Sequence, residues 1–250
     1  MVLARLTYNF GMEKFETGDQ IDISWAACPR WATFESSDLV DAVEQLGGRW
    51  AILLVDVQGS GRGGRRLASL VAREARELLA AGISAETTVR AVHEHLHELR
   101  QGKVGASIHI CEIDPTAELA KIVGLGILTV AAGSADDWTV DFLNGPPAGF
   151  DRSSDVLSLS FSFGVGAWIV LANDGVARGA DDLTVLLASR RPADNCTGAH
   201  QLLSQAIQRD SGRPRSDMAV AIIGRAARIE GPPILEARIS VPVKRFGSDL

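Results

Sequence analysis

Hydrophobic and polar residues alternate in short runs along most of the chain, which predicts strands, and recur every three or four residues in a few longer stretches, which predicts helices. The predicted strands cover residues 4–9, 20–25, 51–55, 106–114, 139–143, 167–172, 218–223 and 235–241, with two more within 118–133. The predicted helices cover residues 65–79, 85–100 and 198–209. From residue 106 the strands follow one another through turns, which indicates an antiparallel meander within an α+β protein.

The first two predicted helices are amphipathic and adjacent, so we expect them to cover one face of a sheet. Ser84 is placed to cap the second helix, and Thr197 to cap the third. The apolar positions of the first helix are Leu67, Leu70, Val71, Ala75, Leu78 and Leu79.

Composition indicates an ordinary globular protein and narrows the classes of partner. The 250 residues are 46% hydrophobic and 22% charged, which suits one large domain or two small ones. The pattern along the chain shows no second domain, so we expect a single domain with its core over about residues 20–224 and a tail over 229–250. The net charge of −6 argues against a partner that is a nucleic acid or an anionic membrane. Cys28, Cys111 and Cys196 lack C-x-x-C spacing and predict neither disulfides nor a cysteine zinc site.

No targeting or membrane-spanning segment is predicted. Arg5 interrupts the apolar start of the chain, which is unlike a signal peptide. The longest apolar run, residues 161–172, is short and contains glycines, so it does not suit a bilayer span. We therefore expect a cytoplasmic protein.

Two apolar strands lead directly into an aspartate. Residues 51–55 run into Asp56, followed by a glycine-rich stretch and a helix, and residues 167–172 run into Asn173 and Asp174. A carboxylate on such a turn, with main-chain carbonyl oxygens beside it, suits Mg²⁺ or Mn²⁺. Two of them can share one cation site, where the metal neutralises their repulsion.

Two other motifs compete with a magnesium or manganese site. Gly59, Gly61 and Gly64 match the dinucleotide-binding pattern G-x-G-x-x-G, but two helices follow instead of the second strand that this fold requires. A structural glycine-rich turn with an incidental Asp56 is a further interpretation of this stretch. His93 and His97, with Glu94, match the H-E-x-x-H pattern of zinc peptidases. The candidate third zinc ligands are His109, Glu112 and His200.

The motifs in their order resemble those of the metal-dependent type 2C (PPM) protein phosphatases, in the SpoIIE/RsbX-like bacterial branch. S-S-D ending at Asp38 resembles S-G-D, and V-D-V-Q-G-S-G around Asp56 resembles D-[GV]-x-G-[HS]-G. G-K-V-G-A-S at residues 102–107 and V-G-L-G at 123–126 resemble the R-G-A-[ST] strand and the V-G-x-G turn. A-N-D-G-V around Asp174 resembles S-D-G-[VL], and G-R-P-R-S-D-M-A-V around Asp217 resembles G-R-x-x-D-D-M-T-V.

This resemblance implies an αββα sandwich of two mainly antiparallel sheets flanked by helices. It implies a serine/threonine protein phosphatase with two Mn²⁺ or Mg²⁺ ions, in which a metal-activated water attacks phosphorus. Carried over by position, Asp56 and Asp174 are the catalytic metal ligands, and the Val57 carbonyl binds one ion. Asp38 is either a metal ligand or an acceptor for a metal-bound water, and Asp217 is a further candidate ligand. The implied substrate is a phosphorylated signalling protein, such as an anti-sigma factor antagonist in a stress-response, partner-switching pathway.

The sequence also departs from the family pattern. Ser216 stands where the family has its first closing aspartate, and Asp217, the next residue, is expected to point to the opposite side of the strand. Ala219, Asn173 and Val104 replace the usual threonine, serine and arginine. These differences predict one weak metal site or reduced activity, and they leave a pseudophosphatase that binds a protein partner as an alternative.

Overall fold

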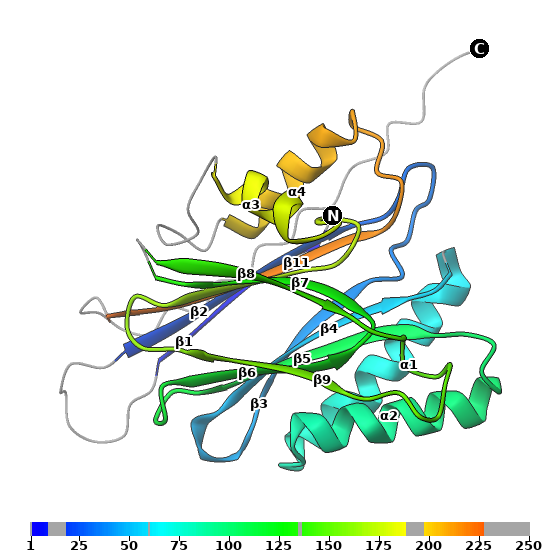
Figure 1. The fold of residues 1–250 in the computed structure, drawn as a ribbon, viewed down its shortest axis with the longest axis horizontal. Coiled ribbons are helices and arrows are strands. Elements are labelled where there is room, and N and C mark those ends of the chain that lie inside the picture. Colours follow the sequence, from blue (N-terminus) through cyan, green and yellow to red (C-terminus); the bar gives the residue numbers. More distant parts are fainter. Residues whose placement is uncertain (1, 10–18, 60, 135–136, 189–197, 228–250) are drawn as a thin grey trace.

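Two antiparallel sheets stack face to face, and a pair of helices covers the outer face of each (Figure 1). This computed structural model describes residues 2–9, 19–59, 61–134, 137–188 and 198–227. The arrangement is the predicted α+β sandwich with the layer order αββα.

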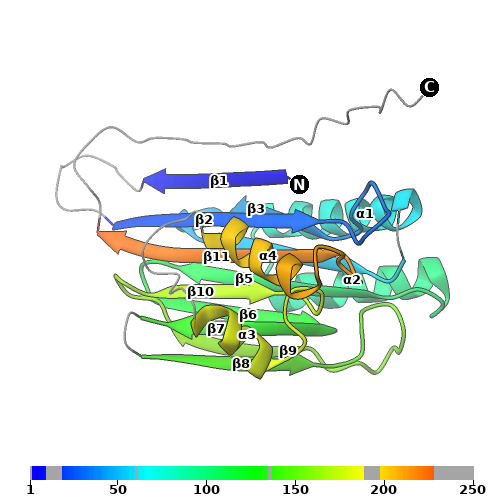
Figure 2. The ribbon, with the colours of Figure 1, turned by 90° about the horizontal axis from the view of Figure 1, so that it is seen from above.

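The six-stranded sheet has the order β1-β2-β11-β10-β7-β8, and every neighbouring pair is antiparallel. Figure 2 shows it with β1 at one edge and β8 at the other. Its strands are β1 (Val2–Asn9), β2 (Asp19–Cys28), β7 (Ile127–Gly133), β8 (Trp138–Asn144), β10 (Trp168–Ala172) and β11 (Met218–Ala227).

The five-stranded sheet has the order β3-β4-β5-β6-β9 and is also antiparallel throughout. A short 3-10 helix, η1 (Leu46–Gly48), joins its first two strands. The strands are β3 (Leu39–Glu44), β4 (Trp50–Val57), β5 (Ala106–Asp114), β6 (Leu119–Leu125) and β9 (Leu157–Ser162).

The helices α1 (Gly61–Ala80) and α2 (Ala85–Arg100) pack against β4, β5 and β6, as predicted for two adjacent amphipathic helices. On the opposite side, α3 (Ala180–Ala188) contacts β7 and β8, and α4 (Gly198–Arg209) contacts β2 and β11. The Ser84 hydroxyl caps α2 by accepting a hydrogen bond from the Thr87 N–H. No helix in the described residues is long and apolar enough to cross a membrane.

Strand β4 is apolar except at Asp56, because both of its faces are covered. Leu53 and Val55 belong to the core between the five-stranded sheet and the α1/α2 pair, whereas Ile52 and Leu54 belong to the core between the sheets. All four side chains are fully buried. A third apolar layer lies between the six-stranded sheet and the α3/α4 pair.

Several element boundaries differ from the predictions. Helix α1 begins at Gly61, because the glycine-rich stretch forms its first turn, and β4 continues to Val57. Strand β9 was not predicted, although its apolar positions alternate with serines, as suits a half-buried edge strand. Strands β2 and β11 extend further because they pair with each other over ten residues. The predicted strand at 235–241 and the Thr197 cap lie outside the described residues.

Candidate metal centre

The two strand-end aspartates line one pocket at the end of the sandwich. Asp56 is the penultimate residue of β4, and Asp174 lies two residues beyond the end of β10. The pocket has a volume of about 270 Å³. Its lining includes Arg30, Ser37, Asp56, Val57, Gln58, Gly59, Ser107, Gly126, Ile127, Gly145, Pro147, Asp174, Arg215, Ser216 and Asp217. The two sheets therefore bring together carboxylates that are far apart in the sequence.

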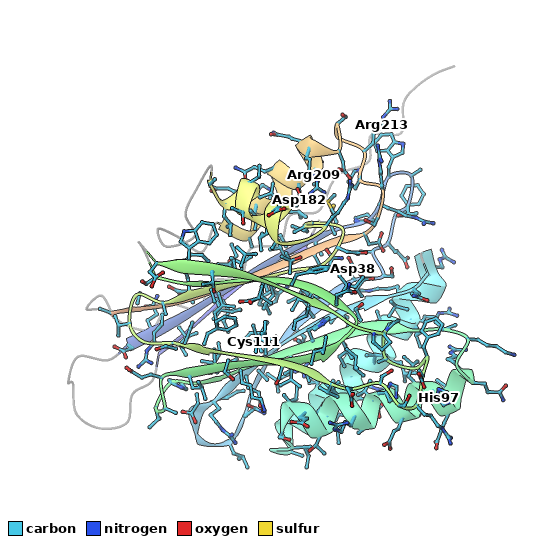
Figure 3. All side chains as sticks on the ribbon, viewed as in Figure 1. Asp38, His97, Cys111, Asp182, Arg209 and Arg213 are labelled. Atoms are coloured by element: carbon cyan, nitrogen blue, oxygen red, sulfur yellow. The ribbon has the colours of Figure 1, made fainter. Side chains whose placement is uncertain are left out.

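Asp38 lies behind this pocket, immediately before β3, with 1% of its surface exposed. Figure 3 shows it between the sheets, on the side where α1 begins. The Asn173 side-chain amide donates to Asp38 Oδ2 at 2.7 Å and, in a longer contact, to Asp56 Oδ2 at 3.4 Å. The other carboxylate oxygen of Asp38, Oδ1, is buried and has no hydrogen-bond partner among the described residues.

The carboxylates are crowded enough to disfavour their charged forms. Burial, and then the negative charge of Asp174, raise the pKa of Asp56 to about 6, although hydrogen bonds with Asp38 and Asn173 oppose the shift. Burial, together with the nearby Asp56, raises the pKa of Asp38 well above its usual value. A cation placed among these groups would relieve both the repulsion and the loss of hydration.

The residues present fit a hard divalent cation. The unpartnered Asp38 Oδ1 and the carboxylates of Asp56 and Asp174 supply oxygen ligands, and Val57 lines the same pocket as these two aspartates. Within the described part of the chain, no three side chains of His, Cys, Asp or Glu are arranged to hold an ion by themselves. A cation here would therefore also need main-chain carbonyl oxygens and water, which Mg²⁺ commonly retains in proteins.

We expect the metal-free protein to lose stability as the pH rises from about 4 to 7. The raised pKa means that the folded form of Asp56 binds a proton more tightly than the unfolded form, so stability falls as that proton is lost. A pKa near 6 in place of about 4 corresponds to roughly 2–3 kcal/mol. Urea unfolding in EDTA at several pH values measures this loss, and added Mn²⁺ should reverse it. A flat profile with no effect of Mn²⁺ would contradict the expectation.

Asp217 braces two loops beside the pocket. One oxygen of its carboxylate accepts hydrogen bonds from the Ser37 N–H and hydroxyl, each at 2.6 Å, and the other accepts from the Arg30 N–H at 2.7 Å. The same two loops are joined by a hydrogen bond from the Trp31 N–H to the Pro214 carbonyl, and Arg213, labelled in Figure 3, stacks over the Trp31 ring. Asp217 lines the pocket, but these donors already occupy both of its oxygens.

Asn173 and Arg209 hold the turn that carries Asp174. The fully buried Asn173 side chain also accepts hydrogen bonds from the N–H groups of Val176 and Ala219. The Arg209 guanidinium donates to the carbonyls of Gly175 and Val176 and pairs with Asp182 at 2.6 Å, and Figure 3 shows this pair in the α3/α4 layer. The sequence analysis predicted neither role. It identified Asn173 only as a replacement for the usual serine.

Gly175 allows the strands to approach closely at this turn. A Cβ atom added to Gly175 would lie 2.0 Å from the Asp217 carbonyl oxygen and 3.1 Å from Ser216 Oγ. The turn carrying Asp174 is therefore in contact with the start of β11. Any other residue at this position would push the two segments apart.

Two arginines that the sequence analysis did not single out, Arg30 and Arg215, line the pocket. They come from the two loops that Asp217 braces. They place positive charge beside the carboxylates, where a phosphate group could be bound.

The H-E-x-x-H histidines bind the main chain of the loop that precedes β9. His93, which is 5% exposed, accepts a hydrogen bond at Nδ1 from the Gly149 N–H, and burial lowers its pKa. His97 Nδ1 lies 3.1 Å from the Gly149 carbonyl, to which it can only donate. These two histidines attach the end of α2, labelled at His97 in Figure 3, to the loop. The main chain of Gly149 thus takes the Nδ1 atoms of both histidines, and within the described residues no further His, Cys, Asp or Glu joins them in a group that could hold a metal ion.

Comparison with solved structures shows the fold of bacterial phosphatases. A structure of the phosphatase domain and part of the regulatory domain of SpoIIE from Bacillus subtilis matches with a TM-score of 0.74 and 17% identity, covering 86% of this chain and 66% of that chain. The RsbU and RsbW domains of a Mycobacterium tuberculosis protein match with a TM-score of 0.69 and 20% identity, over 92% and 64% of the two chains. RsbX in complex with magnesium matches with a TM-score of 0.63 and 11% identity, over 88% and 100%.

The sequence comparisons identify the family. No curated protein matches significantly. The model of the family described as stage II sporulation protein E (SpoIIE) matches residues 46–226, which include β4 and Asp56, the turn with Asp174, and most of β11. With a match over most of its length and the fold of the SpoIIE phosphatase domain, the chain belongs to the SpoIIE family of PPM-type phosphatases.

Proposed function

We propose that this protein is a metal-dependent phosphatase that removes phosphate from serine or threonine of a signalling protein. The observation that supports the proposal most is the meeting of Asp56 and Asp174, from opposite sheets, in one pocket with Arg30 and Arg215. The pocket thus combines oxygen donors for a cation with positive charge for a phosphate group.

The residues have distinct roles in this proposal. Asp56 and Asp174, with the Val57 carbonyl, bind Mn²⁺ or Mg²⁺, and Asp38 binds the ion or orients a water beside it. A bound divalent cation supplies Lewis-acid activation of water and neutralises phosphate charge. Asn173 fixes the orientation of Asp38 and Asp56 through its hydrogen bonds. Arg30 and Arg215 bind the phosphate group at the pocket.

The substrate class follows from the family resemblance and is part of the proposal. A phosphorylated anti-sigma factor antagonist, or a similar protein of a cytoplasmic partner-switching pathway, is the expected substrate. The structural likeness to RsbU and RsbX supports this class of substrate.

The direct test is phosphate release from p-nitrophenyl phosphate by the purified protein with Mn²⁺ or Mg²⁺. We expect turnover that EDTA abolishes and that added metal restores. Substituting Arg215→Gln should raise KM more than it lowers kcat, because the guanidinium contributes to phosphate binding. Absence of turnover with either metal would contradict the proposed enzymatic activity.

A pseudophosphatase that binds a protein partner remains the second candidate, and Ser216 is the observation that favours it. Ser216 lines the pocket where the family pattern has an aspartate, and a hydroxyl is a weaker ligand for a hard cation than a carboxylate. A protein that neither binds Mn²⁺ nor releases phosphate would fit this candidate.

We expect Ser216→Asp to increase Mn²⁺ affinity and the rate of phosphate release. Because Ser216 Oγ lies close to the turn that carries Asp174, a carboxylate at this position would add a charged ligand to the same pocket. The gain should be about tenfold or more, comparable to other changes around metal sites. Calorimetric titration of both proteins with Mn²⁺ measures it, with Ser216→Asn, which matches aspartate in size but lacks its charge, as the control. Equal affinity in Ser216→Asp and wild type would contradict the prediction.

A further inference from the structure

We propose that a groove along the first half of α1 binds an acidic segment of a protein partner. This groove would recognise a protein partner of the proposed phosphatase. The identity of that partner therefore rests on the proposed function. The test measures binding without catalysis, so the two proposals can fail separately.

The groove is formed by one side of α1 and the loop before β3. It has a volume of about 680 Å³ and is lined by Glu35, Arg62, Arg65, Arg66, Ser69, Leu70 and Arg73. The four arginines are exposed. Positions 62, 66, 69 and 73 follow the three- and four-residue spacing that places side chains along one side of a helix. Arg62, Arg66 and Arg73 therefore lie along one side of α1, with Ser69 between the last two, and Arg65 lies beside them. We call these arginines the basic stripe, and the groove that they line the α1 groove.

The four arginines of the α1 groove are unpaired within the described part of the chain, and Glu35 is the one acidic residue that lines the groove with them. None of these arginines forms an ion pair there, and the first turn of α1 contains no acidic residue. Like charges three or four residues apart destabilise a helix, and cations near a helix N-terminus oppose its dipole. In a chain with a net charge of −6, this local excess of positive charge would be stabilised by an anionic partner.

An apolar pocket adjoins the α1 groove and shares Glu35 and Arg65 with it. Its volume is about 300 Å³, and Phe34 at its edge is 79% exposed. Its other lining residues include Trp25, Ala27, Pro29, Ser36, Asp38, Leu39 and Val40. One peptide segment can place acidic side chains along the basic stripe and an apolar side chain in this pocket. A nucleic acid backbone would meet only four arginines on an acidic protein, which is a small basic surface for that class of partner.

The α1 groove also touches the metal centre through one residue. Arg65 Nη1 donates a hydrogen bond to the main-chain carbonyl of Asp38 at 3.2 Å. A partner that engages Arg65 would thus contact the segment carrying Asp38. For this reason Arg65 is left unchanged in the test below, so that the metal centre stays intact.

The test compares two triple variants that remove the same charge. Arg62→Gln/Arg66→Gln/Arg73→Gln alters the α1 groove, and Arg100→Gln/Lys103→Gln/Arg152→Gln alters exposed cationic residues elsewhere. Glutamine is a good helix former, so α1 should stay folded. The probes are a fluorescein-labelled peptide of glutamates around a leucine pair, the same peptide with glutamine for glutamate, and a single-stranded oligothymidine. Binding is followed by fluorescence anisotropy at several salt concentrations.

We expect the glutamate peptide to bind the wild type and the control variant equally, and the groove variant roughly tenfold more weakly, since each exposed ion pair contributes only a few-fold to affinity. The glutamine peptide should bind poorly to all three proteins. Turnover of p-nitrophenyl phosphate should be the same in all three. The proposal is overturned if both variants bind the glutamate peptide as the wild type does, if no protein binds it, or if oligothymidine binds more tightly through the same arginines.

Discussion

Asp56→Asn is expected to abolish metal-dependent phosphate release while making the metal-free protein more stable at pH 7. The substitution keeps the size of the side chain but removes the charge that Asp174 repels within the pocket. Removing a residue that only hydrogen-bonds to a metal ligand typically lowers metal affinity or activity about 10–100-fold. Removing a ligand itself should therefore lower turnover more than about a hundredfold. The same change removes a buried charge whose raised pKa destabilises the fold by roughly 2–3 kcal/mol at neutral pH.

Both effects can be measured on the same protein. Turnover of p-nitrophenyl phosphate with Mn²⁺ gives the first, and urea unfolding in EDTA gives the second. The exposed Asp155→Asn is the matched control and should change neither quantity. Unchanged turnover in Asp56→Asn would contradict the assignment of this residue, and lower stability in EDTA would contradict the proposed repulsion.

Asp217→Ala is expected to lower the free energy of unfolding by about 2–4 kcal/mol, because it leaves buried donors without an acceptor. The carboxylate accepts from the Ser37 N–H and hydroxyl and from the Arg30 N–H. Without it, the loops before β3 and before β11 lose their main connection beside the pocket. Removing one negative charge near Asp38 offsets part of the loss.

Thermal or urea unfolding in EDTA measures the destabilisation from Asp217→Ala, with Asp155→Ala as the control. In EDTA any contribution of Asp217 as a metal ligand is absent, so the loss reports its bracing role alone. Stability equal to that of the control would show that the three hydrogen bonds contribute little. The resemblance-based assignment of Asp217 as a metal ligand is tested separately, by Mn²⁺ titration of the same variant.

Local pattern was sufficient for most of the secondary structure. The apolar stripe and the Ser84 cap predicted α2 at the bounds that the structure shows, and strict alternation did the same for β5. These signals depend only on neighbouring residues. Where a boundary depended on a distant strand, as in the long pairing of β2 with β11, the local pattern stopped too early.

The pocket was predictable in part. An apolar strand that ends at an aspartate indicated where Asp56 and Asp174 would lie, and the structure places both at one pocket. Arg30 and Arg215 could not be found this way, because they reach the pocket through two loops whose folding depends on Asp217 and on the contact between Trp31 and Pro214. The hydrophobic periodicity of the sequence does not predict contacts between loops.

The H-E-x-x-H motif shows what helical spacing can and cannot predict. The spacing does place His93 and His97 on the same side of α2. What faces them is the main chain at Gly149, with which both histidines interact. Helical spacing predicts which residues share a face but contains no information about the segment packed against it.

The central claim is that Asp56 and Asp174 bind one divalent cation together. Crystals grown with Mn²⁺ and measured at a wavelength where manganese scatters anomalously test it most directly. We predict an anomalous peak in the pocket within coordinating distance of both carboxylates. An anomalous map with no peak between Asp56 and Asp174, in crystals that contain Mn²⁺, would contradict the claim.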